Sequence, residues 1–193
     1  MSDDAGAELW LVRHGETEWS REHKHTSVTD LPLTQLGEQQ ARDAARLLDG
    51  AEFDRVLTSP RLRARHTAEL AGFGDAELDD DLVEWAYGEY EGRTTVDIRT
   101  DDPGWSVWQG LTPGGETPDE IAVRLDRVVA AAREHGGRTL VFAHGHSLRA
   151  LTARWLGLSA AAGRHFLLGT GTVSVLGDDR GEPVVARWNI AAR

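Results

Sequence analysis

An arginine and a histidine directly follow a short apolar run near the start of the chain. Residues 9–12 (L-W-L-V) have the pattern of a buried strand, and Arg13, His14 and Gly15 come next. Arginine offers a planar fork of N–H donors to phosphate oxygens, and histidine can act as a nucleophile that forms a covalent intermediate. Gly15 would let the backbone approach a ligand closely. Alone the tripeptide is a weak signal, because an arginine paired with a carboxylate beside a half-buried histidine would look the same.

Residues 53–58 predict a second short strand, which also ends in a polar turn. The helix expected next, at 61–71, opens with Arg61, Arg63 and Arg65. A helix N-terminus attracts anions through its free backbone amides and its dipole. We expect Arg61 and Arg65 at the rim of a site, where either could meet a second phosphate.

A third strand is predicted at residues 139–143, and it ends in His144. In a mainly parallel sheet the carboxyl ends of these three strands should lie at the same edge. Open α/β sheets bind their ligands beyond that edge. The side chains brought together would be Arg13, His14, Arg63 and His144. This set suits phosphoryl transfer: one histidine attacks phosphorus, and the other groups hold the equatorial oxygens, over which the transition state spreads its charge.

Phosphoryl transfer to a histidine also needs an acid that protonates the leaving alcohol oxygen. The segment 82–92 is aromatic, acidic and irregular, and it places Glu84 beside Trp85 and Tyr87. Burial among aromatic side chains would favour the protonated form of a carboxyl group. Glu84 is therefore the candidate proton donor.

The order of the elements predicts an α/β fold. Strands are expected at 9–12, 53–58 and 139–143, with helices at 34–50, 61–71, 117–134 and 148–156, a short strand near 76–78, and β segments at 172–176 and 183–190. Alternating strands and helices indicate a three-layer sandwich with a mixed, mainly parallel sheet and helices on both faces. The length predicts one domain over residues 1–193. Residues 21–33 and the tryptophan-containing stretch 101–115 are expected to be loops, the second a lid or a substrate loop.

Composition restricts the partners and the location of the protein. The chain has 21 basic and 32 acidic side chains, and its net charge of −11 disfavours nucleic acid and anionic membranes as partners. It has no cysteine, so disulfides and thiolate metal sites are excluded. The acidic start lacks the pattern of a signal peptide, and no apolar stretch approaches the ~20 residues that span a bilayer. We expect a cytoplasmic protein.

Several blocks of the sequence occur together in one order. They are R-H-G-E-T-E-W-S at 13–20, T-D-L-P-L-T-Q-L-G at 29–37, T-S-P-R-L-R-A-R-H-T-A at 58–68, E-W-A-Y-G-E-Y-E-G at 84–92, G-G-E-T at 114–117 and V-F-A-H-G-H-S-L-R-A-L at 141–151. Through these blocks nearly the whole chain resembles the histidine phosphatase superfamily, the phosphoglycerate-mutase-like group. The blocks most resemble its sugar-bisphosphatase branch, which acts on sedoheptulose 1,7-bisphosphate, and its acid phosphatases of broad specificity.

The resemblance implies a role for each matching residue. His14 matches the nucleophile that becomes phosphohistidine, and Glu84 matches the proton donor that later activates water. Arg13, Arg63 and His144 match the rest of the phosphate pocket. The residues expected to contact the substrate are Arg13, Gly15, Ser20, Thr26, Ser27, Arg63, Glu84, Tyr87, His144 and Gly145. Glu16 and Ser59 are motif residues expected in supporting positions near the nucleophile.

The resemblance leaves the acceptor of the phosphoryl group open. The expected function is hydrolysis of a small sugar phosphate or a similar metabolite; the alternative is a cofactor-dependent phosphoglycerate mutase. Ser20 stands where mutases usually carry asparagine, and Ser27-Val28 stands where they carry Gly-Trp, which favours hydrolysis. A third hypothesis, an inactive module that binds a phosphorylated ligand, is disfavoured because the four pocket residues and Glu84 are all present. The resemblance is also compatible with a homodimer formed through a sheet edge.

Two histidine pairs could suggest a metal site. They are His23-x-His25 and His144-x-His146, but each needs a further carboxylate or histidine to complete a coordination sphere. Arginines and histidines can supply the positive charge that magnesium supplies in kinases. We therefore expect neither a metal nor a cofactor, and we expect His146 and His66 to lie beside the catalytic groups or at the surface.

Overall fold

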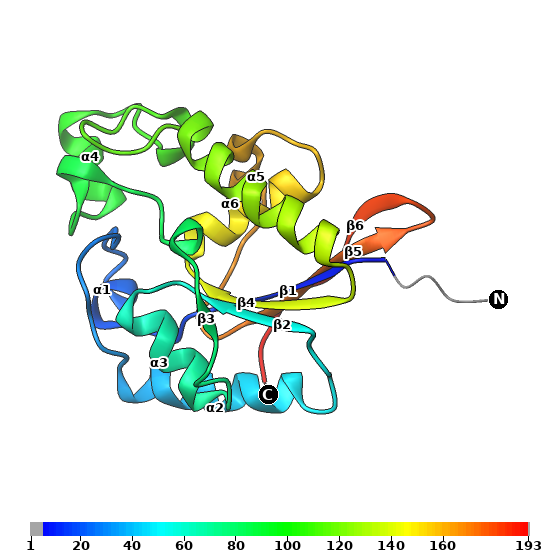
Figure 1. The fold of residues 1–193 in the computed structure, drawn as a ribbon. Helices are drawn as coiled ribbons and strands as arrows, with labels where there is room; N and C mark the ends of the chain where they lie inside the picture. The colour runs from blue at the N-terminus through cyan, green and yellow to red at the C-terminus, as the bar shows by residue number, and fades with distance from the viewer. Residues whose placement is uncertain (1–5, 193) are drawn as a thin grey trace.

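A single six-stranded sheet forms the centre of the computed structural model, which describes residues 6–192 (Figure 1). The acidic start of the chain, on which the expectation about a signal peptide depends, lies mostly outside these residues. The strands are β1 (Glu8–Arg13), β2 (Arg55–Thr58), β3 (Glu77–Leu78), β4 (Arg138–Ala143), β5 (Val173–Asp179) and β6 (Glu182–Ile190). They lie in the order β3-β2-β4-β1-β5-β6.

The pairing confirms a mixed, mainly parallel sheet. Neighbours among β1 to β4 are parallel, whereas β5 is antiparallel to both β1 and β6. The register places Arg13 opposite Ala143 and Thr58 opposite Phe142. Consequently β1, β2 and β4 all end at one edge of the sheet, and the residues that follow them lie close together.

Helices cover both faces of the sheet. They are α1 (Glu18–Arg21), α2 (Gln35–Leu48), α3 (Leu62–Leu70), α4 (Thr95–Asp101), α5 (Pro118–His135) and α6 (Gly145–Trp155). Figure 1 shows α2 and α3 on one face and α5 and α6 on the other. Alternate side chains of β1 serve these two layers: Leu9 and Leu11 belong to the core beneath α5 and α6, and Val12 to the core beneath α2 and α3.

Helix ends follow from local sequence. The side chain of Thr34 accepts a hydrogen bond from the backbone N–H of Gly37 at the start of α2, as expected of a capping threonine. Thr117 and Glu120 form a reciprocal capping box at the start of α5. Helix α5 ends at His135. Gly136 follows with a φ of 70°, a conformation that glycine adopts more readily than other residues.

The structure differs from the sequence-based prediction in three elements near the edge of the sheet at which β1 and β4 end. Helix α6 begins at Gly145, three residues earlier than predicted, so that His144 is its N-cap and Gly145, His146 and Ser147 form its first turn. Helix α4 ends at Asp101, the first residue of the predicted loop 101–115, and was missed, although Thr94 and Asp97 form a capping box at its start. The short helix α1 was missed as well. All three elements border the cavity described below.

None of the helices in the described part of the chain is long and apolar enough to cross a membrane.

Candidate active site

A cavity of about 250 Å³ opens beyond the carboxyl ends of β1 and β4. This is the position at which open α/β sheets bind ligands. Its lining residues come from the ends of these strands, from α1 and the loop after it, from the Glu84 segment, from α4 and α6, and from the segment before β5: Arg13, His14, Thr17, Ser20, His23, Lys24, His25, Thr26, Glu84, Tyr87, Thr95, Gly145, His146, Arg149 and Leu168. The cavity is therefore rich in cationic and imidazole side chains.

His14 is held in one orientation and one tautomer. Its Nδ1 lies 2.7 Å from the carbonyl oxygen of Gly15, and because a carbonyl can only accept, Nδ1 carries the proton. The other ring nitrogen, Nε2, then has a free lone pair. Burial, followed by the charges of Arg63 and Arg13, holds the pKa of His14 well below its usual range. The residue is therefore a neutral imidazole whose Nε2 can attack an electrophile.

His144 and Arg63 form a buried pair beside His14. The Arg63 Nε–H donates to His144 Nδ1 at 3.2 Å, so the His144 proton is on Nε2, which donates to the hydroxyl of Ser59 at 2.7 Å. The rings of His14 and His144 lie 5.2 Å apart. Burial first, and then the neighbouring charge of Arg63, lowers the pKa of His144 well below its usual range.

Three of the four remaining N–H groups of Arg63 fix the loop that borders the cavity. They donate to the carbonyl oxygens of Thr26, Ser27 and Thr29 at 3.1 to 3.2 Å. The side chain is completely buried, and the loop 26–29 is thereby tied to α3. Arg63 therefore combines a structural role with a position close to His14.

Arg13 reaches the cavity directly. One of its terminal nitrogens donates to the carbonyl oxygen of Leu168 at 2.5 Å. Its Nε–H is buried and has no hydrogen-bond partner within the described chain. A buried donor without a partner is costly in free energy.

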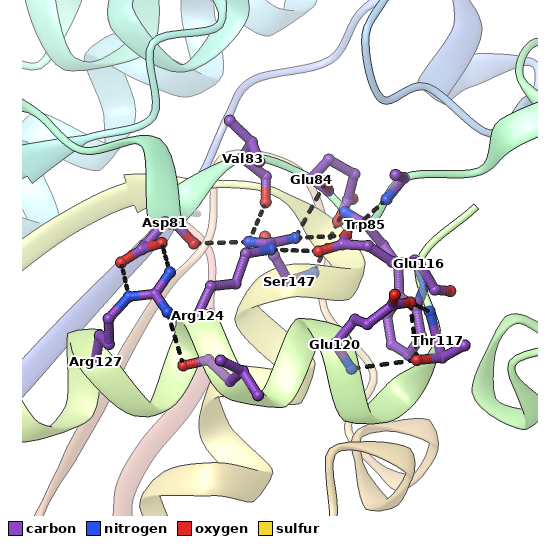
Figure 2. A network of polar contacts seen from close by, with 12 residues as sticks. Asp81, Val83, Glu84, Trp85, Glu116, Thr117, Glu120, Arg124, Arg127 and Ser147 are labelled. Atoms are coloured by element: carbon purple, nitrogen blue, oxygen red, sulfur yellow. Dashed lines mark hydrogen bonds and ion pairs between the residues drawn. The ribbon is translucent and has the colours of Figure 1, made fainter. Parts of the chain in front are cut away.

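Glu84 lies in the same cavity, and three backbone N–H groups hold its carboxyl group. Oε1 accepts from Trp85 and Ser147, both at 2.8 Å, and Oε2 accepts from His146 at 3.0 Å. Figure 2 shows Glu84 above Ser147 of α6. The side chain is 5% exposed. The carboxyl group is thus fixed at the N-terminus of the helix that directly follows His144.

An aromatic and imidazole cluster forms one wall of the cavity. A hydrogen bond of 2.6 Å joins the hydroxyl of Tyr87 and Nδ1 of His146, and the ring of His25 packs 4.7 Å from that of Tyr87. Burial lowers the pKa of His25 to about 4 and raises that of Tyr87 well above its usual range. Both side chains are therefore uncharged at neutral pH.

The structure brings most of the sequence-predicted residues to one place. Those that line the cavity are Arg13, His14, Ser20, Thr26, Glu84, Tyr87 and Gly145. Arg63 and His144 are not among the lining residues, but His144 packs against the ring of His14 and is hydrogen-bonded to Arg63. Of the two residues expected in supporting positions, Ser59 contacts His144, whereas Glu16 accepts from the hydroxyl of Thr34 at the start of α2.

Gly15 and Ser27 do not line the cavity, although the sequence predicted substrate contacts for both. The Gly15 N–H donates to the hydroxyl of Thr67, and a Cβ at Gly15 would lie 2.2 Å from the carbonyl oxygen of Gly37. The glycine thus allows a close approach of two backbone segments, where we expected the approach of a ligand. The Ser27 N–H donates to the carboxylate of Glu91.

Several cavity residues escaped the sequence-based prediction. Lys24 and Arg149 add positive charge to the cavity, whereas Arg61 and Arg65, the expected candidates for a second phosphate, do not line it. Arg149 stands four residues after Gly145 in α6, so helical spacing could have indicated that both share a face. Lys24 lies in an irregular loop, and no periodicity predicts its direction.

The histidine pairs do not form a recognisable metal centre. Within residues 6–192, no group of three histidine, aspartate or glutamate side chains could hold a metal ion. His25 and His146 instead contact Thr95 and Tyr87, respectively. His146 lines the cavity beside the catalytic candidates.

The chain is similar to known phosphatases over most of its length. An acid phosphatase of Mycobacterium tuberculosis is 42% identical over 177 residues, which cover 90% of this chain and 87% of that protein. The sedoheptulose 1,7-bisphosphatase of Saccharomyces cerevisiae is 39% identical over 181 residues, which cover 77% of this chain and 67% of the yeast protein.

A solved structure has nearly the same fold. The product of an open reading frame of Mycobacterium tuberculosis superposes with a TM-score of 0.93 at 39% identity, over 97% of this chain and 99% of the other. Residues 9–191 match the family described as the histidine phosphatase superfamily (branch 1). The protein therefore belongs to the histidine phosphatase superfamily.

Proposed function

We propose that the protein hydrolyses a small phosphorylated metabolite through a phosphohistidine at His14. The state of the His14 ring supports this proposal most directly. Its Nδ1–H is donated to the Gly15 carbonyl, and Nε2 is left as a neutral nucleophile in a cavity that Arg13 also lines. A neutral imidazole beside an arginine, whose guanidinium suits phosphate oxygens, can attack a phosphoryl group.

In the first step, His14 Nε2 attacks phosphorus and the bond from phosphorus to the leaving alkoxide oxygen breaks. Glu84 gives its proton to that oxygen, so the product leaves as a neutral alcohol. Arg13, Arg63 and His144 stabilise the charge on the equatorial oxygens. The Nε2–H of His144 reaches a phosphoryl oxygen by exchanging its hydrogen bond to the Ser59 hydroxyl.

In the second step, water takes the place of the alcohol. Glu84, now ionised, accepts a proton from the water as its oxygen attacks phosphorus, and the bond from phosphorus to Nε2 breaks. Inorganic phosphate leaves, and both His14 and Glu84 return to their initial protonation states. The same carboxyl group thus serves as acid and then as base.

The shape of the cavity supports a small substrate that carries polar or anionic groups besides the transferred phosphate. Its volume of about 250 Å³ suits a sugar phosphate, and Lys24 and Arg149 line it together with His23, His25 and Tyr87. The yeast relative is named for a sugar bisphosphate. We therefore propose a sugar phosphate as the substrate class, with a second anionic group held by Lys24 and Arg149.

The proposal is tested by phosphate release from a panel of sugar mono- and bisphosphates, 3-phosphoglycerate and an aryl phosphate, with a chelator present throughout. We expect release from sugar phosphates that the chelator does not reduce and that His14→Ala abolishes. Isomerisation of 3-phosphoglycerate on addition of a bisphosphoglycerate primer, without phosphate release, would show a mutase instead. Binding of the phosphorylated compounds without turnover would indicate an inactive binding module.

A further inference from the structure

Arg124 of α5 uses three of the five N–H groups of its guanidinium on the segment that carries Glu84, and the other two on Glu116. Nη1 donates to the carbonyl oxygens of Asp81 and Val83 at 2.6 and 2.9 Å, and Nη2 donates to that of Glu84 at 3.3 Å. The two remaining N–H groups donate to the carboxylate of Glu116 at 2.7 and 2.9 Å. Five donors therefore meet five acceptors, and the residue is only 8% exposed (Figure 2).

Glu116 fastens the other side of the same segment. Its carboxylate accepts from the backbone N–H of Ala86 at 2.9 Å, and its backbone carbonyl accepts from the indole N–H of Trp85 at 2.8 Å. Its backbone N–H donates to the carbonyl oxygen of Ala86 at 2.9 Å. Figure 2 shows Glu116 between Arg124 and Trp85. Glu116 is the acidic residue of the G-G-E-T block, to which the sequence assigned no role.

Close backbone packing completes the attachment. A Cβ at Gly88 would lie 2.1 Å from the carbonyl oxygen of Pro113, and a Cβ at Gly115 would lie 2.5 Å from that of Ala86. The N–H of Glu89 donates to the same Pro113 carbonyl at 2.9 Å. The segment 84–89 therefore has no room to shift toward the loop before α5.

Neither side chain of the pair reaches the substrate. Arg124 and Glu116 are absent from the lining of the cavity, which on this side presents Glu84 and Tyr87. The backbone of Glu84 is thus set by α5 through Arg124, while its carboxyl group is set by α6 through Ser147 and His146. Helices α5 and α6 pack against each other, and together they fix Glu84: α5 holds its backbone and α6 holds its carboxyl group.

We propose that Arg124 and Glu116 are positioning residues for Glu84: they determine where its carboxyl group stands relative to the leaving oxygen. This inference rests on the proposed function, because it takes Glu84 as the proton donor. Displacement of a catalytic group by about 1 Å can cost on the order of 100-fold in rate, so loss of the pair affects the step that needs the proton. A pair that only stabilised the fold would not distinguish one substrate from another.

The experiment compares two substrates with leaving groups of different basicity. The value of kcat/KM covers the reaction up to departure of the leaving group, so it isolates transfer to His14 from later hydrolysis. An alkyl or sugar phosphate needs the proton from Glu84, whereas an activated aryl phosphate such as 4-nitrophenyl phosphate leaves without it. The variants are Glu116→Gln and Arg124→Lys, with thermal unfolding measured for each.

The matched control is Arg127→Gln. Arg127 lies on the same helix three residues after Arg124, and its guanidinium pairs with the side chain of Asp81 at the surface (Figure 2). We expect Arg127→Gln to leave both kcat/KM values within about twofold of the wild type, because exposed ion pairs contribute little. Glu84→Gln in the same assays supplies the reference for loss of the donor itself.

We expect Glu116→Gln to lower kcat/KM roughly tenfold or more for the alkyl phosphate and less than about threefold for the aryl phosphate. Arg124→Lys should show the same selectivity, and because lysine offers three donors to five acceptors, it should also unfold at a lower temperature. If the lysine variant does not fold, Glu116→Gln decides the question.

Equal losses with both substrates, or no loss with the alkyl phosphate, would overturn the positioning role. The reference variant separates this failure from failure of the proposed function. If Glu84→Gln also loses both activities equally, then Glu84 is not the proton donor. If Glu84→Gln is selective and Glu116→Gln is not, only the inference about Arg124 and Glu116 is wrong.

Discussion

The carboxyl group of Glu84 accepts a hydrogen bond from the backbone N–H of Ser147 at 2.8 Å. Ser147 lies in the first turn of α6, and that helix begins directly after His144. The same helix N-terminus therefore holds the proposed proton donor and follows a residue of the proposed phosphate pocket. Fixed dipoles of this kind need little reorganisation during the reaction, which is how enzymes stabilise developing charge.

Replacement of Glu84 by glutamine should slow the reaction most for substrates whose leaving group needs a proton. The amide keeps the shape of the side chain but gives no proton to an alkoxide. We expect kcat/KM for sugar phosphates to fall about 100-fold or more, and that for an aryl phosphate to fall much less. Initial rates of product formation with both substrates provide the measurement. An equal decrease for the two would argue against Glu84 as the donor.

The buried histidines should remain neutral in mildly acidic solution. Burial, with neighbouring cations, lowers the pKa values of His14, His144 and His146 well below their usual range. In unfolded chains histidine titrates near ~6.5, so between that pH and the folded pKa values the unfolded chain binds more protons. The stability that these residues contribute is therefore fully present above pH ~6.5 and is lost as the pH falls through the folded pKa values.

NMR of histidine-labelled protein, with His14→Ala to assign the resonance, measures this directly. We expect the His14 ring to stay in its neutral form, with the proton on Nδ1, at pH values below 6.5. Urea unfolding at a series of pH values should show a free energy of unfolding that falls on acidification below about pH 6.5. A His14 ring that becomes protonated at or above pH 6.5 would contradict the described environment.

A methyl group at position 15 should destabilise the fold. The Cβ of Gly15→Ala would lie 2.2 Å from the carbonyl oxygen of Gly37, and backbone atoms on both sides must then move apart. We expect a loss of about 3 kcal/mol in the free energy of unfolding, measured by urea denaturation. Gly177→Ala is the control, because no atom lies within 4 Å of a Cβ there. Equal stability of the two variants would show that the approach of Gly15 to Gly37 relaxes freely.

Removal of the charge at position 24 should weaken the binding of substrates that carry a second anionic group. Lys24 lines the cavity and has one exposed partner, the carboxylate of Glu22 at 2.7 Å. We expect Lys24→Met to raise KM for a sugar bisphosphate about fivefold and to leave KM for an aryl phosphate unchanged. Arg21→Met removes a charge from the same region outside the cavity and serves as the control. If the two variants behave alike, general electrostatic attraction explains the effect.

The sequence was sufficient to predict that Arg13, His14 and His144 come together, because each ends or directly follows a strand whose apolar run is plain. Arg13, His14 and His144 come at the ends of β1 and β4, and the parallel register carries them to one edge of the sheet. The layers and the mixed sheet follow from the same alternation of strands and helices. These features depend on local patterns and on general rules of sheet topology.

The outer part of the cavity could not be predicted in the same way. Lys24 and Thr95 come from irregular or short segments that are placed by tertiary contacts, such as the bridge between Lys24 and Thr94. Gly15 shows a second limit of sequence-based prediction. The sequence indicated that a ligand approaches the backbone here, but the structure shows that the group requiring a glycine is the backbone of Gly37. The Arg124–Glu116 pair likewise joins residues whose common partner, the Glu84 segment, is distant in sequence.

Detection of phosphohistidine at His14 tests the central proposal most directly. The protein is mixed with a sugar phosphate, quenched in alkali within one turnover to preserve the acid-labile phosphohistidine, and digested for mass spectrometry. A transient phosphorylated peptide containing His14, absent in His14→Ala, is the predicted result. Phosphate release without such a peptide, or turnover by His14→Ala within tenfold of the wild-type rate, would contradict the proposed mechanism.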